Sequence, residues 1–420
     1  MSPITRPSGR RRAGLLGVIL LSACTAPLFD IRGITLTGDR LLGLGAVMAV
    51  ALIAARGGLR WTPVHSALAV FAGVQVLTSI LAASAWPQGP KFASVYVLGF
   101  ACFALTAAWA AGGGGPGQGA RMWIIAGAVL GAAGAIVGFF SNFRETLLWG
   151  SGRAETLHSG TPRDIFAAKV TFQEWNLYSS FLLVAFALAL WSWRSDAGGL
   201  LRRWGGALSV GGIVQGLAFG LTRAAWIDMA ALAALWLWAR RPAWRRVGAL
   251  VLLVAFAFLL QAVAIGASPL YFRVVQRVQS GWDKNLAGRV AISQDTVKSW
   301  REHPILGKGA GSINALEVEI SARERITKAW NGNAVLFLLH DSGLLGVAAF
   351  ATLVAVVAWM GRRALRRGTD AATRSVLVPL LAAGVALLFA YQFTHGLWLM
   401  YPYVYLGLLT ASMDSARSGA

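Results

Sequence analysis

Charged residues are scarce in this chain. Only 13% of its 420 residues are Asp, Glu, Lys or Arg, against roughly 25% in soluble domains. Hydrophobic residues make up 56%, and the mean hydropathy is +0.60. There is too little polar surface to cover a soluble globular protein. The composition therefore predicts an all-α, polytopic integral membrane protein.

Cysteine and acidic residues are also few. The two cysteines, Cys24 and Cys102, both lie in apolar runs, which excludes a disulfide framework and a cysteine metal centre. No Asp or Glu clusters with His at the spacing of metal ligands, and the expected outward connection 31–37 has no carboxylate. We therefore expect no metal and no other cofactor, unlike membrane glycosyltransferases that use an acidic motif in their first outward loop.

Positive charge, in contrast, is abundant, with 38 Lys and Arg against 17 Asp and Glu and a formal net charge of +21. Such an excess can indicate nucleic-acid binding. Most of these cations, however, fall in short connections between apolar runs, where they set membrane topology. The expected surroundings are membrane lipids, and no nucleic-acid partner is expected.

Apolar runs that can cross a bilayer as helices recur along the whole chain. We expect about twelve spans, near 13–30, 38–55, 63–84, 91–111, 121–141, 172–193, 205–220, 224–239, 247–267, 332–360, 373–392 and 396–413. The first follows an arginine-rich N-terminus without a clear small-residue cleavage pattern, so we expect an uncleaved span.

The arginines of the connections indicate the orientation, because they cluster on alternate connections. They are Arg10–Arg12, Arg56, Arg60, Arg121, Arg202, Arg203, Arg240, Arg241, Arg245, Arg246, Arg362, Arg363, Arg366 and Arg367. With this set inside, both termini are cytoplasmic. We expect one membrane domain over residues 1–420. Its two long outward loops, 142–171 and 268–331, are then periplasmic, and the second is large enough to cover a site.

Arg223 is the first candidate for chemistry. It lies in a connection of three residues, 221–223, on the outward side where the positive-inside rule predicts no arginine. A guanidinium at this place can bind a phosphate or pyrophosphate with two parallel hydrogen bonds. The alternative is an anchor that reaches a lipid phosphate. Arg289, which precedes an expected amphipathic helix at 290–300, is either a second anion ligand or a surface charge.

His340 lies where the second long loop enters the tenth apolar run. Histidine is the usual general base near neutral pH, so His340 is our candidate base for an acceptor hydroxyl. The alternative is a structural histidine. Asp341 is adjacent, but neighbouring residues do not share a helix face, so the sequence does not imply an orienting pair. His395, at another outward helix end, is a weaker candidate.

The first long loop and its surroundings offer substrate-binding candidates. Arg153 and Arg163 either attract an anionic substrate or are solvated surface charges. Gln173 and Asn176 flank Trp175 at the start of the sixth run. We expect the two amides to bind sugar hydroxyls, with Trp175 as a stacking platform.

Several short motifs together resemble the O-antigen ligase/polymerase superfamily of bacterial inner-membrane proteins. They are Thr222-Arg223, Gly288-Arg289, Trp300, Pro304, Gly307, Gly309, Asn333, Leu336 and Gly343-Leu344-Leu345-Gly346. The resemblance covers roughly 150–350. Where that family often has His-Asn, this chain has Gly332-Asn333, and its histidine follows eight residues later at His340. We expect His340 to do the work of the family histidine and Asn333 to bind substrate.

The resemblance implies a glycosyltransferase of the all-helical, GT-C-like type, with its site below a periplasmic lid. The implied donor is an undecaprenyl pyrophosphate-linked glycan, and the implied acceptor is a hydroxyl of lipid A–core oligosaccharide. Arg223 and Arg289 would stabilise the leaving pyrophosphate without a metal, with inversion at the anomeric carbon. Two alternative functions within the same superfamily are a repeat-unit polymerase and a protein O-oligosaccharyltransferase, which differ from the ligase only in the acceptor. A transporter of an anionic lipid is the rival from another class, although transporters generally concentrate polar groups at mid-membrane.

Overall fold

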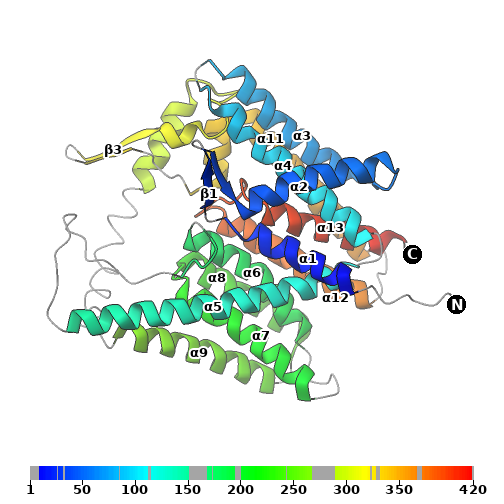
Figure 1. Cartoon of the computed structure of the whole chain (residues 1–420), viewed down its shortest axis with the longest axis vertical. Helices are drawn as coiled ribbons and strands as arrows, with labels where there is room; N and C mark the ends of the chain where they lie inside the picture. Colours follow the sequence, from blue (N-terminus) through cyan, green and yellow to red (C-terminus); the bar gives the residue numbers. More distant parts are fainter. Residues whose placement is uncertain are drawn as a thin grey trace. The chain divides into compact units, whose positions relative to one another are not determined.

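The computed structural model describes residues 9–25, 27–31, 34–84, 86–111, 115–150, 168–172, 174–193, 200–242, 244–266, 289–321, 324–327, 332–366 and 371–418. Over these residues the fold is helical apart from two short β-hairpins (Figure 1). The predicted all-α class is therefore confirmed.

The helices are named in chain order. They are α1 (Gly9–Ser22), α2 (Gly38–Ala55), α3 (Pro63–Leu81), α4 (Gly89–Trp109), α5 (Pro116–Gly150), α6 (Trp175–Ser192), α7 (Leu200–Phe219), α8 (Arg223–Arg240), α9 (Trp244–Gly266), α11 (Ala334–Arg366), α12 (Ala371–Ala390) and α13 (Tyr401–Ser418). A further helix covers 289–300, where the sequence predicts an amphipathic helix, and a 3-10 turn, η2, covers Ser312–Ala315. The hairpins pair β1 (Pro27–Ile31) with β2 (Ile34–Thr37), and β3 (Glu317–Ser321) with β4 (Glu324–Thr327), both antiparallel.

Eight helices of the described residues are long and apolar enough to cross a membrane. They belong to α2, α3, α4, α5, α6, α9, α11 and α12. The other predicted spans also coincide with helices, namely α1, α7, α8 and α13, but these are shorter or more polar. The chain is a polytopic integral membrane protein.

Three predicted boundaries are wrong. The first helix ends at Ser22, because 27–37 form the first hairpin instead of extending the span. The last helix begins at Tyr401 and not at 396, since 391–400 form turns. Helix α5 continues to Gly150, so the beginning of the expected loop 142–171 is helical.

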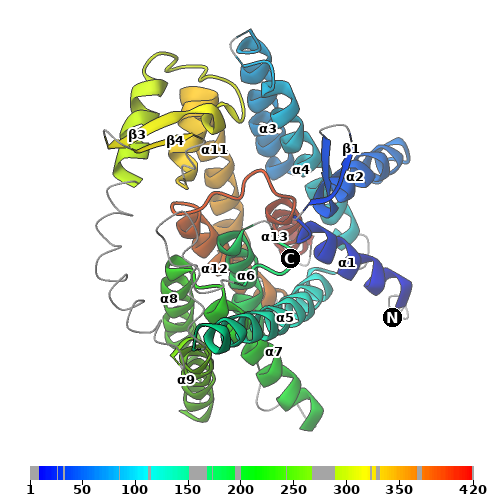
Figure 2. The ribbon, with the colours of Figure 1, turned by 60° about the vertical axis from the view of Figure 1, so that its left-hand side comes forward.

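The chain divides into two compact units, residues 1–122 with 287–420, and residues 123–286. In the first unit α3 packs against α4 and α11, and α4 packs against α2 and α13 (Figure 2). In the second unit α6 packs against α7 and α8. Helix α6 carries apolar residues on all of its faces, and 83% of its residues Trp175–Ser192 are buried. It therefore forms the core of that unit.

Candidate functional site

Helix α11 is interrupted at Gly343. This residue has φ 64° and ψ −161°, a conformation that only glycine adopts easily. A break leaves backbone N–H and C=O groups on both sides without partners inside the helix, and buried groups of this kind must be paired elsewhere. The rest of the site is organised around these groups.

Segment 304–309 supplies the missing partners. Beyond the break, the N–H of Leu344 donates to the carbonyl of Pro304 (2.9 Å), and that of Leu345 donates to the carbonyl of Ile305 (3.2 Å). Before the break, the carbonyl of His340 accepts from Lys308 N–H (3.0 Å). The carbonyl of Asp341 accepts likewise from Gly309 N–H (2.8 Å). The segment is therefore docked into the helix by backbone hydrogen bonds.

Helix α3 holds the same segment from a second side. The hydroxyl of Ser79 accepts from the N–H of Ala310 at 2.9 Å. The indole N–H of Trp86, which follows α3, donates to the carbonyl of Ala310 at 3.0 Å. Segment 304–310 is thus held between α3 and the break in α11, and it gives the following side chains fixed positions.

Replacing Gly343 by alanine should test this docking. A Cβ at position 343 would overlap the carbonyl oxygen of Ile305, and the positive φ is strained for any L side chain. We expect a clear fall in the melting temperature of the detergent-solubilised protein, equivalent to more than about 1 kcal/mol. Gly248→Ala is a matched control, because a Cβ there meets nothing within 4 Å. Equal melting temperatures for the two variants would contradict the proposed docking.

Asp341 anchors the end of the docked segment. Its side chain is completely buried, with 0% exposure. One carboxylate oxygen accepts the N–H of Gly311 (2.5 Å). The other accepts the N–H of Ile313 (3.1 Å) and the hydroxyl of Ser312 (3.1 Å). A single carboxylate therefore satisfies three donors of residues 311–313.

His340 lies inside the same network and is only 1% exposed. Its Nδ1 is 3.1 Å from a carboxylate oxygen of Asp341, and its Nε2 is 3.1 Å from the hydroxyl of Ser299. The sequence did not imply an orienting role for Asp341, but the structure places its carboxylate beside the imidazole. The reason is that segment 311–313 wraps the Asp341 carboxylate and brings it beside the imidazole. With Nδ1–H donating to a carboxylate, Nε2 is left as the basic nitrogen.

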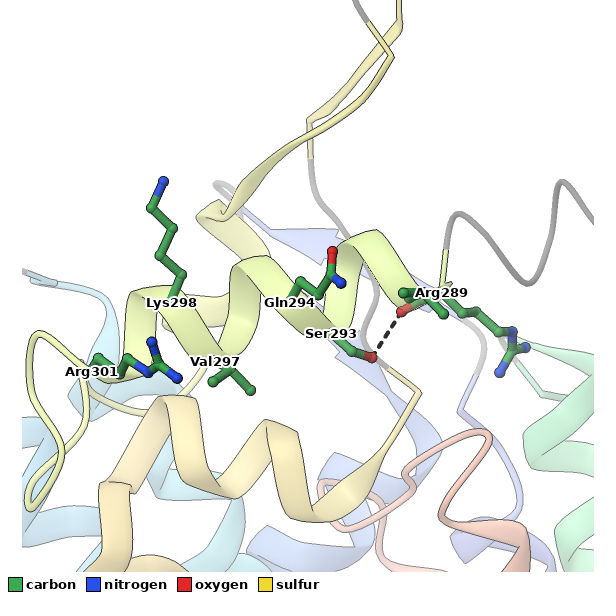
Figure 3. Close-up of a pocket in the computed structure, with 7 residues that line it drawn as sticks. Arg289, Ser293, Gln294, Val297, Lys298 and Arg301 are labelled. Atoms are coloured by element: carbon green, nitrogen blue, oxygen red, sulfur yellow. Dashed lines mark hydrogen bonds between the residues drawn. The ribbon is translucent and has the colours of Figure 1, made fainter.

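Helix 289–300 brings Ser299 to His340 with one face and presents cations with another. Arg289, Lys298 and Arg301 line an open cavity of ≈ 550 Å³ (Figure 3). The other lining residues are Val290, Ser293, Gln294 and Val297. Positions 289, 293, 297 and 301 are spaced at four residues, so they follow one helix face. This spacing could have indicated Arg301 from the sequence, where only Arg289 was singled out.

Glu302, which follows this helix in the chain, is engaged by a neighbouring lysine. Glu302 forms an ion pair with Lys308 at 2.6 Å, and this hydrogen bond lowers the pKa of Glu302. Glu302 does not line the cavity. The lining therefore contains three cations and no carboxylate, which suits an anionic ligand.

Arg223 begins α8 in the second unit, with Thr222 as the preceding cap residue. Thr222 donates to the side-chain oxygen of Asn176 (3.1 Å) and accepts from Ser179 (3.0 Å). Asn176 therefore supports the start of the Arg223 helix. Trp175 is the first residue of α6 and is 44% exposed.

The remaining predicted residues have different surroundings. Asn333 caps α11, because its side-chain oxygen accepts the N–H groups of Val335 (2.9 Å) and Leu336 (3.0 Å). His395 is 1% exposed and packs against the tilted ring of Phe337, and burial lowers its pKa to about 3. Such an imidazole is a weak base. Arg153, Arg163 and Gln173 lie outside the described residues.

Residues 208–351 match the family model described as O-antigen ligase. The match includes Arg223, Arg289 and His340, and it covers the segment docked into α11 up to and beyond the break. No curated protein matches the chain. Over residues 208–351 the chain is therefore similar to the O-antigen ligase superfamily, which suggests a glycosyltransferase-like membrane enzyme.

Proposed function

We propose that this protein is an O-antigen ligase. It transfers a polysaccharide from undecaprenyl pyrophosphate to a hydroxyl of lipid A–core oligosaccharide, on the periplasmic face of the bacterial inner membrane. The supporting observation is the double role of helix 289–300. One face carries the cations of an open cavity, and Ser299 on another contacts His340. A site for an anionic donor and the contact to a candidate base thus lie on one helix.

In this proposal the pyrophosphate of the donor lies in the cavity of Arg289, Lys298 and Arg301. Guanidinium groups bind phosphate oxygens with two parallel hydrogen bonds and keep their charge at any physiological pH. They stabilise the negative charge that develops on the leaving pyrophosphate. Arg223 is proposed as a phosphate ligand in the second unit. Arg153 and Arg163 are proposed to attract the anionic substrates.

His340 is the proposed base. The acceptor hydroxyl takes the place of Ser299 beside Nε2 and transfers its proton there, while Asp341 stabilises the imidazolium through Nδ1. The acceptor oxygen attacks the anomeric carbon as the bond to the pyrophosphate breaks, which inverts the configuration. Because His340 is 1% exposed, this step requires helix 289–300 to move away from α11. Gln173, Trp175, Asn176 and Asn333 are proposed to bind sugar.

The topology belongs to the same proposal. Both termini are assigned to the cytoplasm, and residues 142–171 and 268–331 to the periplasm, on the arginine pattern of the connections. The longer loop would then lie over the site as a lid. Residues 289–321 and 324–327 of this loop are described, and residues 304–313 dock on α3 and α11 in the way set out above.

The lipopolysaccharide of a deletion strain tests the reaction. We expect bare lipid A–core together with accumulated long-chain, lipid-linked glycan, analysed by gel electrophoresis and lipid extraction. Core bearing a single repeat unit would show a repeat-unit polymerase instead. Unchanged lipopolysaccharide with a loss of protein glycosylation would show a protein O-oligosaccharyltransferase, and unligated glycan trapped on the cytoplasmic face would show a transporter.

Arg289→Gln should lower the rate of glycan transfer by about 10²-fold, as for the loss of one donor to a developing negative charge. The measurement is ligation in detergent or nanodiscs with purified lipid-linked donor. Lys308→Gln is the matched control, because Lys308 lies in the same loop but does not line the cavity. Wild-type activity should persist in excess chelator. A comparable loss in both variants, or full loss with chelator restored by a divalent metal, would contradict the proposed role.

A further inference from the structure

A second polar cavity lies in the first unit, away from the docked segment. It has a volume of ≈ 140 Å³ and is lined by Arg60, Thr62, His65, Thr410 and Asp414, with small residues of α4 and α13 between them. His65 and Ser79, the residue of α3 that holds the docked segment, are separated by about 21 Å along the helix at 1.5 Å per residue. We call this space the Arg60–Asp414 cavity, and the proposed glycan transfer does not use it.

The hydrogen bonds of His65 define which of its nitrogens carries the proton. The backbone N–H of Thr62 donates to Nδ1 at 3.2 Å, so Nδ1 acts as the acceptor and Nε2 carries the hydrogen. His65 is 1% exposed, and its Nε2 has no partner among the described residues. The hydroxyl of Thr410, also 1% exposed, has no partner there either. Buried polar groups are rarely left unpaired, so these groups indicate a bound polar ligand.

The cavity has a positive and a negative side. Arg60 lies next to the N-terminus of α3, the positive end of that helix dipole. Asp414 lies near the C-terminal end of α13, and α4 also ends here, so this side carries the negative helix ends. A simple anion would meet Asp414, and a simple cation would meet Arg60. A ligand with one group of each sign fits both sides.

The position of the cavity at the ends of α3 and α4 indicates where such a ligand comes from. Both α3 and α4 are apolar enough to cross a membrane, and the cavity lies where α3 begins and α4 ends. Trp61 beside it is 57% exposed, as expected for an aromatic residue at the level of the lipid head groups. A phospholipid can therefore reach the cavity with its head group while its chains remain in the bilayer.

We propose that the Arg60–Asp414 cavity binds the head group of a phospholipid carrying a phosphate and a primary ammonium, of the phosphatidylethanolamine class. The phosphate accepts from Arg60, His65 and Thr410, and the ammonium donates to Asp414. A quaternary ammonium cannot donate to Asp414, and a glycerol head group has no cation. The cavity therefore distinguishes ethanolamine from choline and glycerol head groups.

The test uses the full-length protein in nanodiscs that contain equal amounts of phosphatidylethanolamine, phosphatidylcholine and phosphatidylglycerol. The lipids retained after extraction into detergent are counted by native mass spectrometry. We expect the wild type to retain phosphatidylethanolamine in preference. Arg60→Gln should reduce this retention about tenfold, the effect of one lost charge-assisted hydrogen bond. Asp414→Asn should remove the preference over phosphatidylglycerol, whereas Arg56→Gln, outside the cavity, should change neither.

Size-exclusion profiles and melting temperatures identify variants that fail to fold, and Arg60→Lys should restore part of the retention. Equal retention of the three lipids by the wild type would overturn the proposal. So would equal effects of Arg60→Gln and Arg56→Gln. Soluble phosphoethanolamine that displaces the retained lipid at micromolar concentration would also overturn the proposal. It would show that the ligand is the free head group and not a membrane phospholipid.

Discussion

Replacement of Asp341 by alanine is expected to destabilise the protein by about 3–5 kcal/mol, the range for losing one partner of a buried charged interaction. The carboxylate accepts from Gly311, Ser312 and Ile313, and it is completely buried. Without it, two backbone N–H groups and a hydroxyl are left in the interior without an acceptor, and each costs about 1–3 kcal/mol. The docked segment should separate from α11, and the melting temperature in detergent should fall accordingly.

Ser312→Ala is the matched control for Asp341→Ala. It removes one hydrogen bond to the same carboxylate and should cost about 1 kcal/mol. The two variants separate the anchoring role of the carboxylate from a general sensitivity of the region. Limited proteolysis provides a local measurement, because release of segment 304–313 should expose new cleavage sites there. If Asp341→Ala and Ser312→Ala melt alike and resist protease alike, Asp341 does not hold the segment.

Replacement of His340 by glutamine is expected to lower the rate constant of glycan transfer by about 10²–10⁴-fold, the usual contribution of a general base. Glutamine retains a polar group opposite Ser299 but cannot take up a proton at neutral pH. The donor should still bind, because its proposed ligands Arg289, Lys298 and Arg301 are unchanged. We therefore expect a fall in kcat with little change in the KM for the lipid-linked donor.

Ser299→Ala distinguishes a base from a residue that only positions helix 289–300. In the proposed reaction the acceptor hydroxyl displaces Ser299 from Nε2, so the alanine variant should keep most of its activity. If His340 acted only by holding the helix through Ser299, both variants would lose activity together and the KM for the donor would rise in both. Parallel effects of this kind would remove His340 as the base.

The membrane fold could be predicted from the sequence because hydropathy is a local property. A run of about 20 apolar residues forms a helix in a bilayer whatever its neighbours are, since every backbone group must be paired within the segment. The same holds for helix 289–300, whose amphipathic pattern lies within a single element. The first hairpin was not predicted, because Pro27–Ile31 continues an apolar stretch and only its pairing with Ile34–Thr37 makes it a strand.

Some features of the candidate site could likewise be predicted from the sequence, and others could not. Arg289 and His340 could be selected from the sequence, since charge and proton affinity belong to the side chain itself. The pairing of His340 with Asp341 could not, because it depends on residues 311–313, which lie about thirty positions away and surround the carboxylate.

By itself, the sequence determined that this chain is an all-helical membrane protein with a basic segment between two apolar runs and a histidine at its edge. Only the tertiary structure decided that α11 breaks at Gly343, that segment 304–309 fills the break, and that Asp341 orients His340. The physical reason is that a helix break exposes backbone groups whose partners must come from elsewhere in the chain. No local pattern specifies which distant segment will provide them.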